Sequence, residues 1–260
     1  MGLDRTAALR REIDEITRFC RELDGAAWQT PSGASGWRVQ DVVAHLSANC
    51  RAIFTPASLK LLMSKDLERT NDELVDKRRE WPPARVLAEF ERWGRRLAAL
   101  SGVLSRTPAA RVPMPLGELG SFPAAVLLNS AFVFDQHTHL RFDIAPAVGR
   151  PAPDSDELRT AVLLEWMFAV LANQLRKARP GWLDRPVGIR LRGPGGGYWR
   201  IGADGAVTPT ESADCAATVT GTAAEFPGWG TARVPWRQRD VTITGDEQLA
   251  SKLLDALNIV

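Results

Sequence analysis

The chain has 260 residues, enough for one large domain or two ordinary ones, and its 45% apolar and 25% charged residues are those of a soluble globular protein. A formal net charge of +2, with basic residues spread along the chain, argues against a nucleic acid or an anionic membrane as a partner. The three cysteines form no CxxC pair and are too few for a disulfide framework, so we expect a cytoplasmic protein in a reducing compartment.

The first half of the chain is expected to be helical. In three segments the apolar residues recur every three or four positions, which places them on one face of a helix. These segments are residues 4–23, 37–53 and 83–104. The first is charged and lacks the apolar core of a signal peptide, and no segment has the roughly 18 to 20 uncharged residues that a membrane helix needs.

A fourth helix is expected after a proline- and glycine-rich loop at residues 106–120. Ser121 is a good N-cap, and the helix is expected to run to about Phe142, before Pro146. The charged segment 55–81, between the second and third helices, is expected to be helical only in part. Four helices of this length, each with one apolar stripe, predict a four-helix bundle.

The composition changes at residues 145–157, where prolines and small residues mark a linker. The sequence therefore predicts two domains, residues 1–150 and residues 151–260. Asp154 and Glu157 have the spacing of a capping box at the start of a further helix.

The second domain is expected to be of the α+β class with a mostly antiparallel sheet. Short alternating segments predict strands at residues 187–192, 198–201, 217–220 and 241–244. Asp204-Gly205 is a strong signal for a hairpin turn, and Asp246 is expected to cap a closing helix. The whole chain is thus predicted to be α+β, with a helical bundle followed by a smaller α+β domain.

Asp135 and His139 are the first candidates for a functional site. They continue the apolar stripe of the fourth helix, whose other members are Leu128, Ala131, Phe132 and Phe142. A carboxylate and an imidazole that face a bundle core one turn apart are costly unless they are paired or bind something. A hydrogen-bonded pair and a pair of divalent-metal ligands both satisfy this requirement. His137, about 200° around the helix from Asp135, is expected to face elsewhere.

His45 is the natural third ligand. It flanks the apolar stripe of the second helix, so its ring can reach the interior of the bundle. One histidine from this helix and an Asp-x-x-x-His pair from another make three protein ligands, which leave positions open for water or substrate. The predicted metal site is His45, Asp135 and His139.

Two segments resemble the mycothiol-dependent maleylpyruvate isomerase family, a branch of the DinB-like four-helix metalloproteins. In WQTPSGASGWRVQDVVAHL (residues 28–46), the matching features are Trp28, Gly36-Trp37 and the Asp-x-x-x-His run from Asp41 to His45. In FDQHTHLRFDI (residues 134–144), an acidic residue stands four positions before a histidine and an aspartate follows soon after. The resemblance covers about the first 145 residues and implies a DinB-like bundle whose metal ligands are His45, Asp135 and His139.

The sequence departs from the family pattern in three places. Arg38 stands where a capping Thr or Ser is common, which concerns helix stability rather than chemistry. Asp135 replaces a glutamate, so an ion would sit differently. The spacing from His139 to Asp143 is one residue longer than usual, which leaves open a part for His137.

The end of the chain carries a weaker likeness. VTITGDEQLASKLL (residues 241–254) is similar to the closing strand and helix of sterol-carrier-like domains. Such a domain holds an apolar ligand or shapes the active-site cleft.

Two functions follow from these observations. The first is a metal-dependent enzyme, an isomerase or S-transferase, in which a low-molecular-weight thiol (mycothiol, by the resemblance) attacks a small electrophile. Zinc suits the His/Asp ligands and thiol chemistry best, with nickel or iron as alternatives. The second is a non-catalytic metal-containing protein that binds a small molecule or lipid. No general base or nucleophilic side chain is evident, and Arg141 is expected to be an ordinary solvated arginine.

Overall fold

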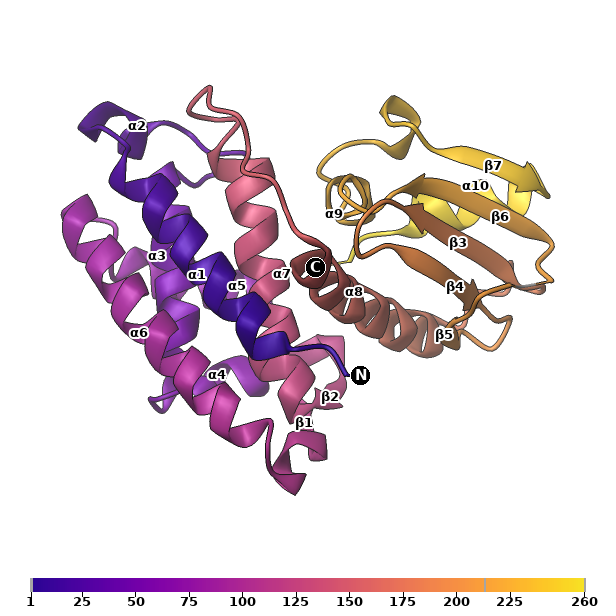
Figure 1. Cartoon of the computed structure of the whole chain (residues 1–260), viewed down its shortest axis with the longest axis horizontal. Helices are drawn as coiled ribbons and strands as arrows, with labels where there is room; N and C mark the ends of the chain where they lie inside the picture. Colours follow the sequence, from indigo (N-terminus) through magenta and orange to yellow (C-terminus); the bar gives the residue numbers. More distant parts are fainter. Residues whose placement is uncertain (1, 213, 260) are drawn as a thin grey trace. The chain divides into compact units, whose positions relative to one another are not determined.

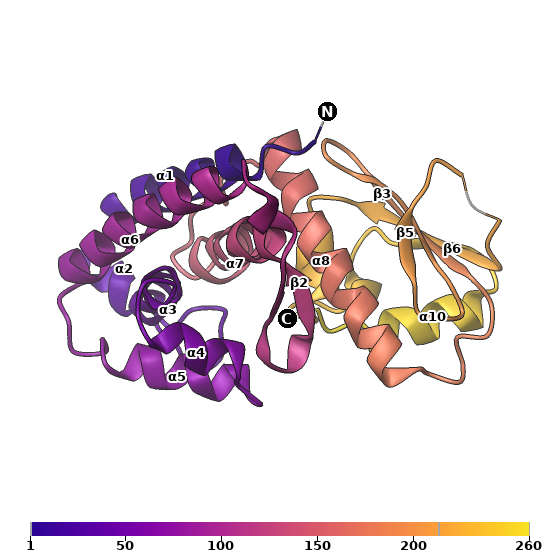
Figure 2. The same cartoon turned by 90° about the horizontal axis from the view of Figure 1, so that it is seen from below.

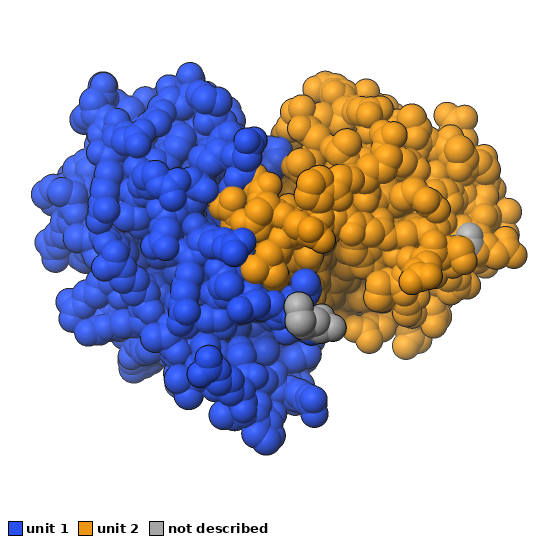
Figure 3. Space-filling model, viewed as in Figure 1, with its two compact units in different colours: residues 1–154 blue, residues 155–260 orange. Residues whose placement is uncertain are grey.

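The computed structural model describes residues 2–212 and 214–259. It forms two compact units, Met1–Asp154 and Ser155–Val260 (Figure 3). The boundary expected between residues 150 and 151 and the division after Asp154 both lie in the linker segment 145–157. That each part folds independently stays a prediction.

The N-terminal unit is built on a four-helix bundle (Figures 1 and 2). Its bundle helices are α1 (Arg5–Arg21), α3 (Val39–Ala52), α6 (Pro83–Leu104) and the helix containing α7 (Ala131–Thr138). Shorter helices occur between them in the sequence: α2 (Gly25–Gln29), α4 (Ala57–Leu62) and α5 (Leu67–Asp76). The apolar stripes meet in the core, where Ile13, Phe90 and Leu97 are buried. The bundle and the partly helical segment between its second and third helices agree with the sequence-based predictions.

The fourth bundle helix begins later than predicted. Ser121 is not its N-cap but lies in the short strand β2 (Ser121–Pro123), which pairs with β1 (Pro113–Pro115). The chain stays extended from Ser121 to Pro123, with Ser121 opposite Pro115, so the helix begins only after the strand, at Ala124.

The same helix changes its winding on both sides of α7. The π-helical segments η3 (Val126–Ser130) and η4 (His139–Ile144) flank α7. A π turn holds more residues than an α turn, so a single stripe of period 3.6 does not stay on one face through it. Phe132 and Phe142, which the stripe placed in the core, are accordingly only half-buried, whereas Leu140 is fully buried.

The C-terminal unit is α+β, with a five-stranded sheet and two main helices. The strands are β3 (Val187–Arg192), β4 (Gly197–Ile201), β5 (Val207–Pro209), β6 (Ala217–Thr222) and β7 (Thr242–Gly245). Their order is β5-β4-β3-β6-β7, and all neighbours are antiparallel except β3 and β6. The helices α8 (Glu157–Ala178) and α10 (Glu247–Ala256) pack against this sheet, and the short helix α9 (Phe226–Gly230) lies between β6 and β7 in the chain.

Two local predictions for this unit have different outcomes. Gly205, between β4 and β5, has a φ of 77°, as the expected hairpin turn requires. The N-cap of α8 is Asp156 rather than Asp154, because the Asp156 carboxylate accepts a hydrogen bond from the Arg159 amide at 2.9 Å.

Among the residues that the structure describes, none of the helices has the length and apolar character needed to span a membrane.

Candidate metal centre

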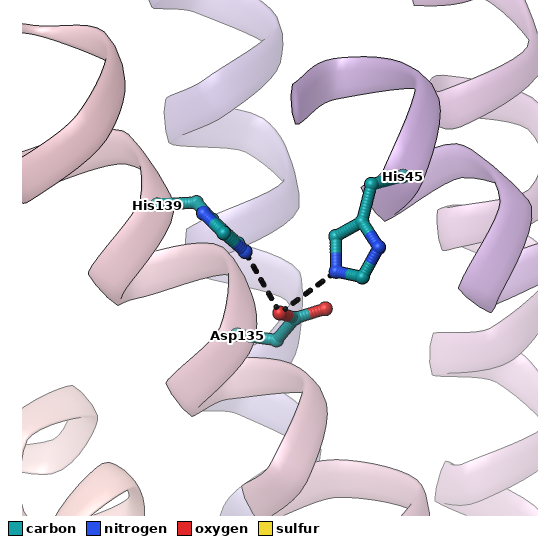
Figure 4. A group of neighbouring side chains, drawn as sticks. All are labelled: His45, Asp135 and His139. Atoms are coloured by element: carbon teal, nitrogen blue, oxygen red, sulfur yellow. Dashed lines mark hydrogen bonds and ion pairs between the residues drawn. The ribbon is translucent and has the colours of Figure 1, made fainter. Parts of the chain in front are cut away.

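The three residues predicted to bind a metal come together between α3 and α7 (Figure 4). His45 projects from α3, Asp135 from α7, and His139 is the first residue of η4. Asp135 Oδ1 lies 3.2 Å from His45 Nε2 and 3.3 Å from His139 Nε2. One ligand atom from each residue lies within 4.8 Å of the other two. Both imidazoles therefore direct Nε2 at the same carboxylate oxygen.

The carboxylate is the most accessible part of this cluster. The side chain of Asp135 is 23% exposed, compared with 6% for His45 and 11% for His139. The cluster is therefore open to solvent on the side of Asp135. Catalytic metal sites need such an open side, whereas structural sites are closed by protein ligands.

The charges of the cluster are coupled. Burial alone would raise the pKa of Asp135, but His45 and His139 hold it well below its usual range. Burial alone would lower the pKa of His139, but hydrogen bonds to Asp135 and Asp143 raise it to about 9. The raised pKa of His139 favours its protonated form, so a cation that binds its Nε2 competes with a proton.

Asp143 supports the site from behind. Its Oδ2 lies 2.6 Å from His139 Nδ1, and its side chain is almost fully buried. This contact directs Nε2 of the same ring toward Asp135, as the outer carboxylates of metal-binding histidines commonly do. Asp143 was not among the residues predicted for the site, although the His-x-x-x-Asp separation already places it one helical turn from His139.

His137 does not take part in the cluster. Its Nδ1 lies 2.8 Å from Oε1 of Glu12 on α1, and both side chains are buried. Glu12 Oε2 also accepts a hydrogen bond from Arg141 at 3.0 Å. The expectation that Arg141 is solvated is therefore wrong, because this buried carboxylate and the carbonyl oxygens of Pro153 and Asp154 bind its guanidinium.

Asn49 is a site residue that was not predicted from the sequence. Its amide Nδ2 lies 3.4 Å from Asp135 Oδ2 and 3.3 Å from His45 Nε2. It follows His45 by one helical turn on α3, so the spacing offered a signal for it. The amide donates to the carboxylate oxygen that the two histidines leave free.

Trp37 forms a wall beside the two imidazoles. Its ring centroid lies 5.0 Å from that of His45 and 6.4 Å from that of His139. The indole Nε1 donates a hydrogen bond to Asp72 Oδ1 on α5 at 2.9 Å, which fixes the direction of the ring. The Gly-Trp pair of the sequence motif thus reaches the site through its tryptophan.

Asp41, the acidic residue of the first motif, has a structural role. Its fully buried carboxylate accepts a hydrogen bond from the Arg38 backbone amide at 3.0 Å, which satisfies a free N–H at the start of α3. The side chains of Arg38 and Arg79 pair with the same carboxylate. Asp41 therefore stabilises the helix that carries His45.

The donor set suits a divalent cation. Two imidazole nitrogens and one carboxylate oxygen are ligands of zinc and related ions, and they leave coordination positions open. The second imidazole nitrogen of His139 is held by Asp143, as such sites require. Within the described part of the chain, Nδ1 of the buried His45 has no hydrogen-bond partner. The contacts fit both a metal ion and a hydrogen-bonded triad.

Comparison with known proteins finds a family match for the N-terminal unit. Residues 9–132 match the family model described as the mycothiol maleylpyruvate isomerase N-terminal domain. The matched segment covers most of the helical unit, which is therefore similar to this family. The family resemblance expected from the sequence is thereby confirmed. His45 lies inside the matched segment, whereas Asp135 and His139 lie just beyond it.

Solved structures share the fold of nearly the whole chain. A crystal structure of the mycothiol-dependent maleylpyruvate isomerase is 17% identical with a TM-score of 0.61, over 94% of this chain and 93% of that one. A mutant of that enzyme, at 16% identity, gives a TM-score of 0.60 over the same shares. At these identities the likeness concerns the fold alone.

Two further comparisons are less informative. Uncharacterized proteins from two strains of Mycobacterium tuberculosis are each 25% identical over 251 residues, which cover 93% of this chain and 90% of the relative. The solution structure of a sterol carrier protein domain from Helicoverpa armigera covers 36% of this chain with a TM-score of 0.31, too low to assign a ligand to the C-terminal unit.

Proposed function

We propose that this protein is a metal-dependent enzyme that uses a low-molecular-weight thiol, mycothiol by family, to isomerise or conjugate a small electrophile. The observation that carries the proposal is the convergence of His45, Asp135 and His139, with one ligand atom each within 4.8 Å, around a carboxylate that solvent can reach. A purely structural cluster would not need this accessible side.

His45 and His139 would hold the ion through Nε2, and Asp135 would hold it through a carboxylate oxygen. When bound, a divalent ion, which we propose is zinc, lowers the pKa of a thiol and polarises an electrophile. Asp143, which holds His139 Nδ1, would keep Nε2 of that ring directed at the ion. Asn49 holds the second oxygen of Asp135, and Trp37 shields one side of the site from water.

The properties of the cysteines in the chain favour a nucleophile supplied by a separate thiol molecule. Burial raises the pKa of Cys20 to about 12 and also raises the pKa of Cys50. Burial raises the pKa of the half-buried Cys215 as well. The described residues thus offer no cysteine with the lowered pKa of a reactive thiol, so a thiol mechanism needs an external donor.

Because all three cysteines are free, we place the protein in the cytoplasm.

Turnover should require both the metal and the thiol. Maleylpyruvate, the substrate named for the structural relative, is the first electrophile to test, with loss of substrate followed by its absorbance. We expect turnover with zinc and mycothiol, and at least about a 100-fold loss when the thiol is omitted or a chelator is added. Turnover that is unaffected by chelation and by omission of the thiol would contradict the proposed mechanism.

A further inference from the structure

Backbone hydrogen bonds bridge the loop before α3, and one of its side chains lies beside the metal centre. The amide of Val39 donates to the Thr30 carbonyl at 2.9 Å, and the amide of Ser32 donates to the Trp37 carbonyl at 2.8 Å. These bonds hold residues 30–38, here called the Gly33 loop, in one conformation. Its single aromatic residue, Trp37, lies beside the imidazoles of His45 and His139.

Gly33 brings this loop into direct contact with Asp143. Its amide donates a hydrogen bond to the Asp143 carbonyl oxygen at 3.0 Å. A Cβ atom at Gly33 would lie 2.8 Å from the Phe142 carbonyl oxygen, 2.9 Å from Asp143 Oδ1 and 3.0 Å from Asp143 Cα. Two of these three atoms belong to the backbone, so a side chain at Gly33 requires the loop or η4 to move.

Asp143 transmits this contact to the candidate ligand. Its Oδ1 faces Gly33 and its Oδ2 holds His139 Nδ1 at 2.6 Å. The carboxylate is therefore fixed between the loop and the imidazole. A displacement of Asp143 turns the His139 ring, which moves Nε2 relative to Asp135 and His45.

We propose that the Gly33 loop is a positioning element of the metal centre: Gly33 fixes Asp143 and thereby the direction of His139 Nε2. The inference rests on the proposed metal site and adds Gly33, which is not one of the three candidate ligands, to the residues that determine metal affinity. Glycine is required at position 33 because Asp143 and the Phe142 carbonyl oxygen approach it closely. The φ of Gly33 is not positive, so its backbone conformation is not the reason.

The test compares zinc affinity and the cobalt absorption spectrum in the wild type and four variants. Gly33→Ala should weaken zinc binding by about 10- to 100-fold, as expected when the hydrogen-bond partner of a metal-binding histidine is displaced, and should change the cobalt spectrum. Gly25→Ala is the matched control, because an added Cβ there meets nothing within 4 Å, and its affinity should equal that of the wild type. Asp143→Asn should lose affinity in the same range as Gly33→Ala.

The double variant Gly33→Ala/Asp143→Asn separates positioning from a general structural effect. If Gly33 acts through Asp143, the double variant loses about as much affinity as Asp143→Asn alone. Additive losses, or wild-type affinity in Gly33→Ala, would overturn the inference while leaving the metal site in place. A wild-type protein that binds no zinc would overturn both this inference and the proposed function.

Hydrogen exchange decides the question if Gly33→Ala does not fold. In the wild-type protein, the Gly33 amide should exchange more slowly with zinc than without it, because an ordered Asp143 strengthens the hydrogen bond that Gly33 donates. Equal exchange of this amide with and without zinc would overturn the coupling.

Discussion

Replacement of His45 or His139 by alanine should leave a folded protein whose affinity for zinc is at least about 100-fold lower. Each change removes a side chain that binds the metal directly, rather than one that only forms a hydrogen bond to a ligand. Each residue contributes an Nε2 atom directed at Asp135 Oδ1. Zinc affinity is measured by competition with a chromophoric chelator, and metal content by elemental analysis. Full metal occupancy in both variants would show that these residues are not the ligands.

His137 provides the internal control for this prediction. It lies two residues from both Asp135 and His139, but its ring contacts Glu12 on α1. His137→Gln, which retains a polar side chain, should bind zinc within about threefold of the wild type, since it removes no ligand. A loss of affinity as large as that of His139→Ala would mean that the wrong histidine had been assigned.

Replacement of Glu12 by alanine should cause one of the largest losses of stability in the N-terminal unit. The carboxylate is fully buried and pairs with His137 at 2.8 Å and Arg141 at 3.0 Å. Its removal leaves the guanidinium of Arg141 buried without this counter-charge, which costs about 3–5 kcal/mol. Urea unfolding of the metal-free protein, followed by the helical circular dichroism signal, measures the change.

Arg21 gives a matched comparison on the same helix. It pairs with Glu91 at 2.8 Å, but its side chain is 59% exposed. Arg21→Ala should change the free energy of unfolding by less than about 1 kcal/mol, because exposed pairs are screened by water. If Glu12→Ala were no more destabilising than Arg21→Ala, the buried cluster would not contribute as the structure indicates.

Elements with a regular period were predictable from the sequence. The helix Pro83–Leu104 and the strand Val187–Arg192 have the predicted bounds, because their apolar residues repeat without interruption. The bounds and buried face of the fourth bundle helix were harder to predict. Its π-helical segments change the period, and Ser121 lies in a β-strand instead of the helix.

The candidate site was predictable where its residues lie one turn apart or resemble a family motif. His45, Asp135 and His139 were found in this way, and the His-x-x-x-Asp spacing also offered a signal for Asp143. The contact between Gly33 and Asp143 joins segments more than 100 residues apart in the chain. No local pattern encodes such a contact, so it emerges only from the folded structure.

Thiol binding to the cobalt-substituted protein tests the central claim most directly. A thiol sulfur that becomes a ligand of cobalt adds a charge-transfer band in the near ultraviolet. We predict that mycothiol produces this band, with a midpoint pH well below the roughly 8.5 of a free cysteine-type thiol, because the ion stabilises the thiolate. His45→Ala should abolish the band. A cobalt spectrum that no thiol perturbs, in a protein whose C-terminal unit binds an apolar ligand, would contradict the enzyme account and support a non-catalytic binding protein.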